Sequence, residues 1–233
     1  MRARLLIGVA AAVALAAPAA FAPAPAPAQA QRDWTRTIAV TPEGGYRMGN
    51  PDAPVKVVEY LSLTCPTCAH FAEHGAPQLI ADHVRSGRVS LEYRNYVLNA
   101  YDLAAAMISR CAAPQDYFAL NHAILAGQGE WMGRVQAVPP EERRQLAGAP
   151  PIEGMMRIVS WAGLDAIAAR HGVSAAEART CLADQAGLDR IVAMREAGDR
   201  AGVGGTPTFA INGRIAAGVH GWAALEPLIR VAR

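Results

Sequence analysis

Two cysteines, Cys65 and Cys68, stand where an apolar segment meets a helical one, and this junction constrains the fold more than any other feature of the chain. The preceding residues 54–63 (PVKVVEYLSL) are short, apolar and rich in β-branched side chains, which is typical of a buried strand. From Pro66 onward, apolar residues recur at helical spacing. The sequence therefore predicts a strand that leads into a Cys-x-x-Cys motif and a helix that begins inside it.

The helix after the motif leads to a second strand. We expect the helix to continue to about Arg85 with a kink at Pro77, because a proline inside a helix removes one backbone hydrogen bond. Residues 88–98 (RVSLEYRNYVL) alternate apolar and polar positions and predict a strand. Strand, helix and strand in this order indicate a βαβ unit whose two strands are parallel.

The middle of the chain is predicted to be helical. Residues 99–202 contain several segments with helical spacing and show no strand pattern. Ser174 and Glu177 match a capping box at the start of one of these helices. Residues 133–154 are rich in proline, glycine and charge, and they predict a long loop.

Strand character returns near the C-terminus. Two apolar runs, PTFAI and RIAAGV, flank Asn212 and Gly213, a pair that favours a tight hairpin turn. An amphipathic helix follows from Trp222. The predicted order is therefore β-α-β in residues 31–98, a helical insertion in residues 99–202, and β-β-α in residues 203–233.

Residues 1–30 have the layout of a cleavable secretory signal peptide. A basic start is followed by an apolar run to about Phe21, and residues 28–30 (AQA) match an A-x-A cleavage pattern. An uncleaved membrane anchor is the alternative, but the run is short for a membrane span and rich in alanine. We expect cleavage after Ala30 and export to the periplasm.

Charge argues against two classes of partner. Without the two arginines of the leader, the 22 basic residues fall to 20, equal to the 20 acidic ones. A neutral chain lacks the positive field that favours nucleic acid or an anionic membrane surface. All four cysteines lie in the exported part, and an even number of cysteines in an oxidising compartment usually indicates disulfides.

The position of Cys65 makes it the expected nucleophile of the pair. Free N–H groups and the helix dipole at a helix N-terminus stabilise negative charge, and they lower the pKa of a thiol there. Pro66 suits the first helical turn because a residue at that position needs no N–H. Cys68, one turn further on, is placed to attack Cys65 and release a mixed disulfide.

Two other interpretations of the pair are weaker. A zinc site would need more ligands, and at about 100° per residue His70 and His74 fall roughly 140° to 180° away from Cys65 on the helix. A purely structural disulfide would close a very short loop and add little stability. The residues favour a redox-active pair.

A second motif, GGTPTFAING at residues 204–213, connects the pair to a known family. Together with the strand–CPTC–helix unit and the helical insertion, it makes the chain resemble the thioredoxin superfamily, and more closely the DsbA-like thiol oxidoreductases. The resemblance covers nearly the whole exported chain. It implies an α/β thioredoxin fold, with a central mixed sheet flanked by helices and an inserted all-helical subdomain.

The resemblance also implies a substrate site around the cysteines. The family places a cis-proline opposite the disulfide, at Pro207 here, and the backbone of Thr206 could then pair with an extended substrate peptide. Pro66 and Thr67 would border the same site. The best-known oxidases of the family have histidine at the position of Thr67, so we expect a less stabilised thiolate and a weaker oxidant than those relatives.

Glu59 is a further candidate, since it matches a buried acid in the family pattern. It stands in an otherwise apolar strand, six residues before Cys65. A buried carboxyl group with a raised pKa could take the proton of Cys68 during exchange. The alternative is an acid that faces water at the edge of the sheet.

Cys111 and Cys181 lie outside the redox motif. Each falls on the apolar face of a predicted helix, so buried free thiols are one interpretation. Export favours the other, a structural disulfide between them. The two positions are 70 apart, and closing such a loop contributes about 4 kcal/mol in the chain-entropy treatment of disulfides.

On this resemblance we expect a periplasmic thiol:disulfide oxidoreductase that introduces disulfides into reduced or unfolded exported proteins. A DsbB-type membrane quinone reductase would reoxidise it, and a monomer without metal or organic cofactor would suffice. A disulfide isomerase or reductase is the alternative within the same chemistry, although residues 31–53 are too few for a separate dimerisation domain. A copper-binding protein that uses Cys65 and Cys68 is the alternative from another class, and metal stoichiometry would distinguish it.

Overall fold

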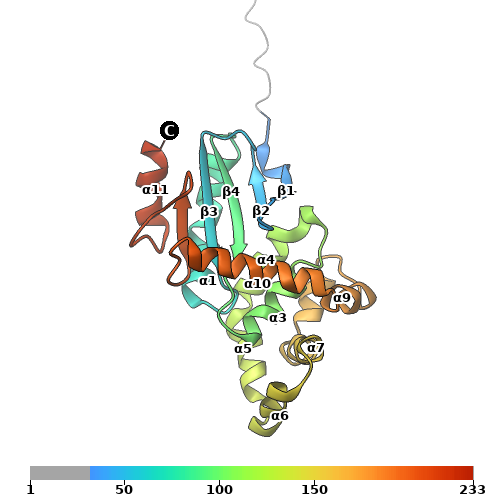
Figure 1. Cartoon of the computed structure of the whole chain (residues 1–233). Coiled ribbons are helices and arrows are strands. Elements are labelled where there is room, and N and C mark those ends of the chain that lie inside the picture. Colours follow the sequence, from blue (N-terminus) through green and yellow to red (C-terminus); the bar gives the residue numbers. More distant parts are fainter. Residues whose placement is uncertain (1–31, 233) are drawn as a thin grey trace, which may run out of the picture. The chain divides into compact units, whose positions relative to one another are not determined.

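A six-stranded mixed sheet organises residues 32–232, the part of the chain that the computed structural model describes (Figure 1). The strands are β1 (Ile38–Val40), β2 (Tyr46–Gly49), β3 (Val55–Leu61), β4 (Val89–Asn95), β5 (Thr208–Ile211) and β6 (Arg214–Ile215). Their order is β1-β2-β4-β3-β5-β6, with β3 and β4 parallel and the other neighbours antiparallel. The predicted signal peptide lies outside the described residues, and no helix within them is long and apolar enough to cross a membrane.

The helices fall into three groups along the chain. They are α1 (Pro66–His74), α2 (Ala76–Leu79), α3 (Ala100–Ser109), α4 (Tyr117–Ala126), α5 (Gln128–Ala137), α6 (Pro140–Arg144), α7 (Pro151–Ala162), α8 (Leu164–Ala169), α9 (Ala175–Leu182), α10 (Gln185–Arg200) and α11 (Trp222–Val231). Helices α1 and α2 connect β3 to β4, α3 to α10 connect β4 to β5, and α11 follows β6. The predicted mixed α/β fold with an all-helical insertion is confirmed.

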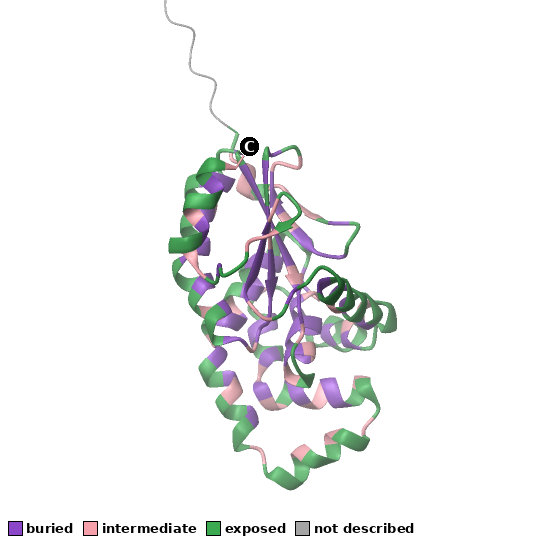
Figure 2. Cartoon of the chain, turned by 60° about the vertical axis from the view of Figure 1, so that its left-hand side comes forward, coloured by how far each residue is buried: buried purple, intermediate pink, exposed green. Residues whose placement is uncertain are grey.

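The two faces of the sheet are covered differently. On one face, Phe71 of α1 packs edge-on against Phe209 of β5, with 4.7 Å between ring centroids, and Tyr117 of α4 stacks on Tyr46 of β2 at 3.6 Å. Helix α10 crosses the other face, where Gly198 lies so close to Tyr96 that a Cβ would stand 2.9 Å from its ring. Figure 2 shows the buried strands between helices whose outer sides are exposed.

The helix after the cysteine motif breaks at Gly75, so the kink predicted at Pro77 is wrong in position. Pro77 has no N–H to bond the carbonyl of Glu73, and the helix is interrupted in the turn before the proline. A Cβ on Gly75 would stand 2.5 Å from the ring of Phe71, so the glycine leaves room for this core side chain. Pro77 takes a first-turn position of α2, and a π-helical turn over Ile80–Val84 continues the segment.

The long loop predicted for residues 133–154 is wrong, because α5, α6 and the start of α7 occupy most of that stretch. Pro140 and Pro151 each stand at the first position of a helix, where a missing N–H is no loss. Trp131 and Val135 bury the inner side of α5. The high proline content of residues 133–154 predicts a loop wrongly, because these prolines begin helices.

The predicted C-terminal hairpin is confirmed. Asn212 and Gly213 connect β5 to β6 with φ values of 49° and 80°. A two-residue turn with both φ values positive matches the twist of the flanking strands, and asparagine followed by glycine is the sequence that adopts it most readily.

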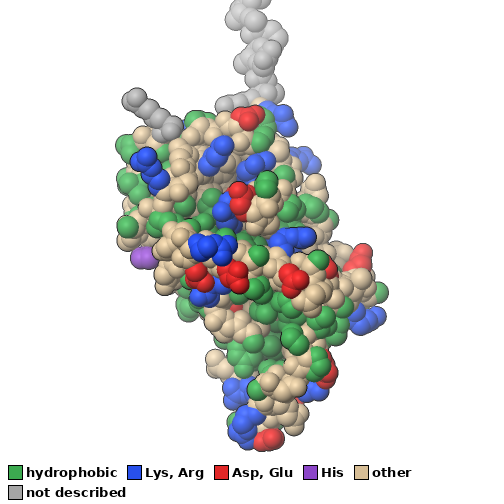
Figure 3. Space-filling model, viewed as in Figure 1, with side chains coloured by type: hydrophobic (Ala, Val, Ile, Leu, Met, Phe, Trp, Pro, Cys, Tyr) green, Lys and Arg blue, Asp and Glu red, His purple; other side chains and the backbone are tan. Residues whose placement is uncertain are grey.

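Charged side chains of both signs are interspersed over the face shown in Figure 3. Several form pairs one helical turn apart, such as Arg157 with Glu153 and Arg195 with Asp199. Exposed pairs of this kind contribute only about 0.3–0.5 kcal/mol each, so the stability of the fold rests on the core and not on these pairs.

Candidate active site

The local fold gives the two motif cysteines different surroundings. Strand β3 ends at Leu61, and Cys65 is the N-cap residue of α1, with Pro66 at the first helical position. Both cysteines are unbonded thiols. The residue Cys65 is 9% exposed and Cys68 is 0% exposed, so only Cys65 can meet the sulfur of another protein. Pro66 and Thr67 are exposed beside it.

The thiol of Cys65 is strongly acidified, and its pKa falls from 9.0 to about 5. The largest cause is a hydrogen bond from the thiol of Cys68, and the hydroxyl of Thr206 and the backbone N–H groups of Cys68 and Thr67 contribute, while burial opposes them. The Thr206 hydroxyl is buried without a regular hydrogen-bond partner in the described residues, which leaves it available to the sulfur. The helix N–H groups expected from the sequence are thus only one part of the effect.

The thiol of Cys68 has the opposite character. Burial, the hydrogen bond to Cys65 and the charge of Glu59 raise its pKa well above 9.0. At neutral pH the pair therefore consists of a Cys65 thiolate and a protonated Cys68. This is the division of roles that nucleophilic attack by one sulfur and later resolution by the other requires.

Glu59 lies inside the protein, behind the two cysteines. It is 2% exposed in the middle of β3, where it pairs in register with Tyr93 of β4 and Phe209 of β5. Burial, and then the charge of Cys65, raises the pKa of its carboxyl group well above 4.5. One carboxyl oxygen has no hydrogen-bond partner in the described part of the chain. The water-facing alternative for this side chain is therefore wrong.

Glu59→Gln is expected to raise the free energy of unfolding at pH 7, because the amide has nearly the shape of the carboxyl group but does not ionise, and each unit by which burial raises the carboxyl pKa corresponds to about 1.4 kcal/mol. The pKa of Glu59 is higher in the folded state than the unfolded value near 4.5, so the wild-type protein loses stability as pH rises above about 4.5. The variant has no such loss, and below about pH 4 the two proteins should be equally stable. Urea unfolding at pH 4 and pH 7 measures the difference, and an advantage that does not grow with pH would contradict the raised pKa.

A distant loop completes the site. The Thr206–Pro207 peptide bond is cis, and the carbonyl oxygen of Thr206 lies 3.1 Å from the sulfur of Cys65, where it accepts a hydrogen bond from the protonated form of the thiol. On the far side of the loop, Nδ1 of His220 lies 3.0 Å from the carbonyl oxygen of Pro207. The structure therefore brings together Cys65, Cys68, Glu59 and the Thr206–Pro207 loop, with Pro66 and Thr67 at the surface.

The helical insertion holds the loop that carries Cys65, a contact that the sequence did not predict. The carboxylate of Asp102 in α3 accepts hydrogen bonds from the backbone N–H groups of Leu63, at 2.8 Å, and Leu98, at 2.9 Å. Gln128 of α5 donates its side-chain amide to the carbonyls of Leu63 and Cys65, at 2.8 Å and 3.1 Å. Both side chains are buried, and burial is the main cause that raises the pKa of Asp102 to about 6.

Cys111 and Cys181 form a disulfide within the insertion, with 5.7 Å between their Cα atoms. Cys181 belongs to α9, whereas Cys111 lies two residues beyond the end of α3 and not on its apolar face as predicted. The bond joins the turn after α3 to α9. His70 and His74 lie against each other at 4.5 Å on the exposed side of α1, and no group of three or more potential ligands among the described residues could hold a metal.

The site combines a thiolate at a helix start, a buried thiol one turn further on and a cis-proline loop that lies against them. Together these groups define a thiol–disulfide site, and it is built on a mixed sheet with a helical insertion. The family model described as "Thioredoxin" matches residues 41–230, and the chain belongs to this family. The crystal structure of protein-disulfide isomerase from Novosphingobium aromaticivorans is similar, with a TM-score of 0.74 and 31% identity over 79% of this chain and 94% of that one. Wolbachia pipientis alpha-DsbA1 has a TM-score of 0.66 and 22% identity over 82% and 92% of the two chains, and it supports the fold.

Curated relatives are similar over a shorter stretch. A Rickettsia felis protein named "Putative protein-disulfide oxidoreductase" is 30% identical over 118 residues, which are 45% of this chain and 42% of that protein. The chain thus spans less than half the length of the curated relatives that it matches. The resemblance to DsbA-like oxidoreductases and the thioredoxin fold with its helical insertion are confirmed.

Proposed function

We propose that the chain is an exported thiol:disulfide oxidoreductase that introduces disulfides into reduced proteins through Cys65 and Cys68. The contrast between the two thiols carries the proposal, because Cys65 has a pKa of about 5 while Cys68 is fully buried with a raised pKa. A stabilised thiolate stabilises the reduced pair, and a stable reduced pair makes the disulfide a good oxidant. The names of the Novosphingobium and Rickettsia relatives support the same class of chemistry.

The reaction follows from the arrangement of the groups. A substrate thiolate attacks the sulfur of Cys65, the Cys65–Cys68 bond breaks, and Cys68 leaves as a thiolate that takes the proton of Glu59. A second substrate thiolate then attacks the substrate sulfur of the mixed disulfide, and Cys65 leaves as a thiolate. The substrate loses two electrons and the cysteine pair gains them.

The setting of this reaction is part of the proposal. Residues 1–30 would direct the protein to the periplasm, where reduced or unfolded exported proteins are its substrates. The backbone of Thr206 would pair with an extended substrate segment, with Pro66 and Thr67 beside it. A DsbB-type membrane quinone reductase would reoxidise a monomeric protein that uses neither metal nor organic cofactor, and nucleic acid would not be a partner.

Disulfide isomerisation is the second candidate, since the Novosphingobium relative is described as a protein-disulfide isomerase. The low pKa of Cys65, about 5, stabilises the reduced pair and makes the disulfide a stronger oxidant, which favours the oxidase.

The oxidised protein is expected to form disulfides in reduced ribonuclease A faster than it recovers scrambled ribonuclease A. Equilibration with glutathione should give a reduction potential above that of thioredoxin, about −270 mV, because the Cys65 pKa of about 5 lies below the value near 7 of thioredoxin. A potential at or below about −270 mV would favour a reductase. Faster recovery of scrambled ribonuclease would favour an isomerase, and one bound Cu(I) per reduced protein without exchange activity would favour a copper carrier.

A further inference from the structure

A cavity of about 400 Å³ lies between the α1–α2 segment and helix α4 of the insertion. Sites for small molecules commonly have volumes of about 300–1,000 Å³, and they often lie where two parts of a fold meet. Most of the lining is apolar, and it includes the buried side chains of Ala72, Ala76 and Phe118. Neither Cys65 nor Cys68 lines the cavity, so it is separate from the redox site.

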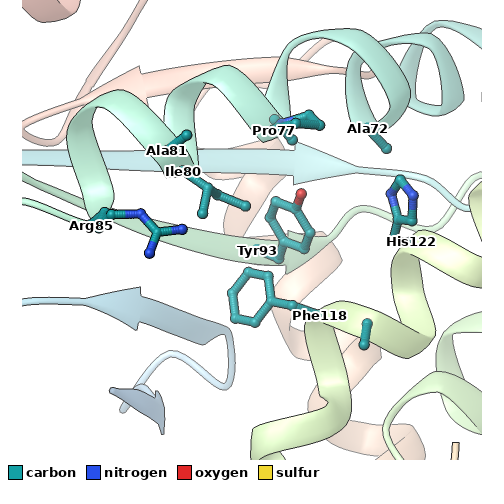
Figure 4. A pocket seen from close by; sticks show the side chains of 10 residues that line it. Ala72, Pro77, Ile80, Ala81, Arg85, Tyr93, Phe118 and His122 are labelled. Atoms are coloured by element: carbon teal, nitrogen blue, oxygen red, sulfur yellow. The ribbon is translucent and has the colours of Figure 1, made fainter. Parts of the chain in front are cut away.

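A polar group, the hydroxyl of Tyr93, is directed into this space (Figure 4). The residue is only 5% exposed, and its hydroxyl has no hydrogen-bond partner among the described residues. Burial is the largest of the causes that raise the pKa of this phenol well above 10, so the hydroxyl keeps its proton. Tyr93 therefore offers a donor to an acceptor inside the cavity.

Water can bond this hydroxyl, but it suits the rest of the cavity poorly. A single water needs only about 10–15 Å³ of accessible volume, so the cavity has room for several waters besides one at Tyr93. Those waters would lie against the side chains of Ala76, Ile80 and Phe118, which offer no hydrogen bonds. Replacing poorly bonded water by apolar groups gains affinity, whereas replacing the water at Tyr93 loses affinity unless another acceptor takes its place. The cavity therefore favours an apolar molecule that carries one acceptor.

The titratable groups at the two ends of the cavity favour a neutral ligand. Figure 4 shows Arg85 at one end and His122 at the other, with Tyr93 between them. The guanidinium of Arg85 forms an ion pair with Asp33 at 2.6 Å, and His122 is exposed to solvent. An ionic group bonded to Tyr93 would be buried without a free counter-charge, which is costly. A carbonyl oxygen accepts a hydrogen bond without carrying a charge.

We propose that this cavity binds a small, neutral and largely apolar molecule through a carbonyl oxygen that accepts a hydrogen bond from Tyr93. The apolar body of the ligand packs against Ile80 and Phe118, so it contacts the α1–α2 segment and α4 at the same time. The ligand enters past Ala119 and His122, which are exposed at the rim. Binding involves no covalent bond and no electron transfer, and it does not depend on the proposed redox function.

Acetophenone is a suitable probe, because it combines a phenyl ring with a single carbonyl oxygen. Titrated into the protein, it should shift the NMR signals of the residues that line the cavity and saturate with a Kd on the order of 0.1–1 mM, which is usual for a ligand of this size. Benzoate has nearly the same shape but a negative charge, and it should bind about 10-fold more weakly. The absence of saturable shifts, or shifts confined to residues outside the cavity, would overturn the site. Benzoate that binds at least as tightly as acetophenone would overturn the neutral class of ligand.

Tyr93→Phe tests the hydrogen bond, because it removes only the hydroxyl and keeps the ring in the core. The Kd for acetophenone should rise about 10-fold, the usual effect of losing one hydrogen bond. The infrared carbonyl stretch of the bound ligand should move to higher wavenumber in this variant, because the carbonyl is then free of a donor. An unchanged Kd together with an unchanged carbonyl stretch would overturn the role of Tyr93.

Two exposed alanines on α4 provide a matched pair of variants. Ala119→Phe fills the cavity from its rim and should raise the Kd for acetophenone by more than about 10-fold, because apolar surface is no longer available to the ligand. Ala126→Phe adds the same side chain outside the cavity and should leave the Kd unchanged. Both positions are exposed, so neither variant disturbs the core. Equal Kd values for the two variants would show that acetophenone binds elsewhere and would overturn the site.

Discussion

Cys65→Ser is expected to reduce thiol–disulfide exchange to background, a loss on the order of 10³-fold or more. Serine has nearly the same shape as cysteine, so the fold should be kept, but its hydroxyl does not ionise near neutral pH and cannot form a disulfide. Cys68 cannot take over, because it is fully buried and its pKa is raised. Oxidation of reduced ribonuclease A measures the activity, and circular dichroism checks the fold.

Cys68→Ala is the matched variant, and it should fail at a different step. Its Cys65 still attacks disulfides, but nothing resolves the product, so mixed disulfides should accumulate and appear on non-reducing gels. The pKa of Cys65 should rise above about 5 in this variant, because the hydrogen bond from Cys68 is the largest cause of the low value. Absorbance of the thiolate in the ultraviolet follows that titration. Faster alkylation of Cys68 than of Cys65 in the reduced wild-type protein would reverse the two roles.

The parts of the site that were predicted from the sequence are those that short segments specify. Residues 61–68 contain the end of the strand, the cysteines and the proline at the first helical position, so local rules place Cys65 at the helix start. The Asn212–Gly213 turn likewise specifies the hairpin. Strands β1 and β2 were not predicted, because three and four residues are too few to show a period.

The groups that hold and tune Cys65 come from distant segments, and no local pattern indicates them. Gln128 donates a hydrogen bond to the carbonyl of Cys65, which lies 63 positions earlier in the sequence. The residues next to Gln128 in the sequence form no motif that indicates this contact. Asp102 follows Asn99 in a helix-capping pattern, which places it at a helix start but does not show that it bonds Leu63. The strength of the Cys65 acidification therefore depends on tertiary contacts, and the sequence alone predicts only its direction.

The prediction of a loop over residues 133–154 is wrong for a different reason. Proline and glycine content predicts breaks, but a proline at the first position of a helix is favourable, and the burial of Trp131 and Val135 rewards a helix there. Composition does not distinguish a proline that ends a helix from one that begins it. The position of the proline relative to the apolar residues does distinguish them, as Pro151 shows, because it is the first residue of the amphipathic helix α7.

Removing the second disulfide is expected to lower the free energy of unfolding by about 4 kcal/mol in Cys111→Ser/Cys181→Ser, since the bond closes 70 residues of the unfolded chain. For a domain of roughly 200 residues this corresponds to a melting temperature lower by about 8–16 °C. Urea and thermal unfolding should be compared with the wild-type protein at equal redox state of Cys65 and Cys68, because that pair changes stability as well.

The same double variant separates stability from reactivity. Cys111 and Cys181 do not contribute to the low pKa of Cys65, and Asp102 and Gln128 hold the Cys65 loop through hydrogen bonds of the folded insertion. In the folded double variant, the thiolate titration should therefore keep its midpoint near pH 5, and the exchange rate should be unchanged at 25 °C. A loss of stability below about 1 kcal/mol would contradict the structural role of the bond. A shifted midpoint would instead show that the disulfide, through α3 and Asp102, sets the geometry of the loop that presents Cys65.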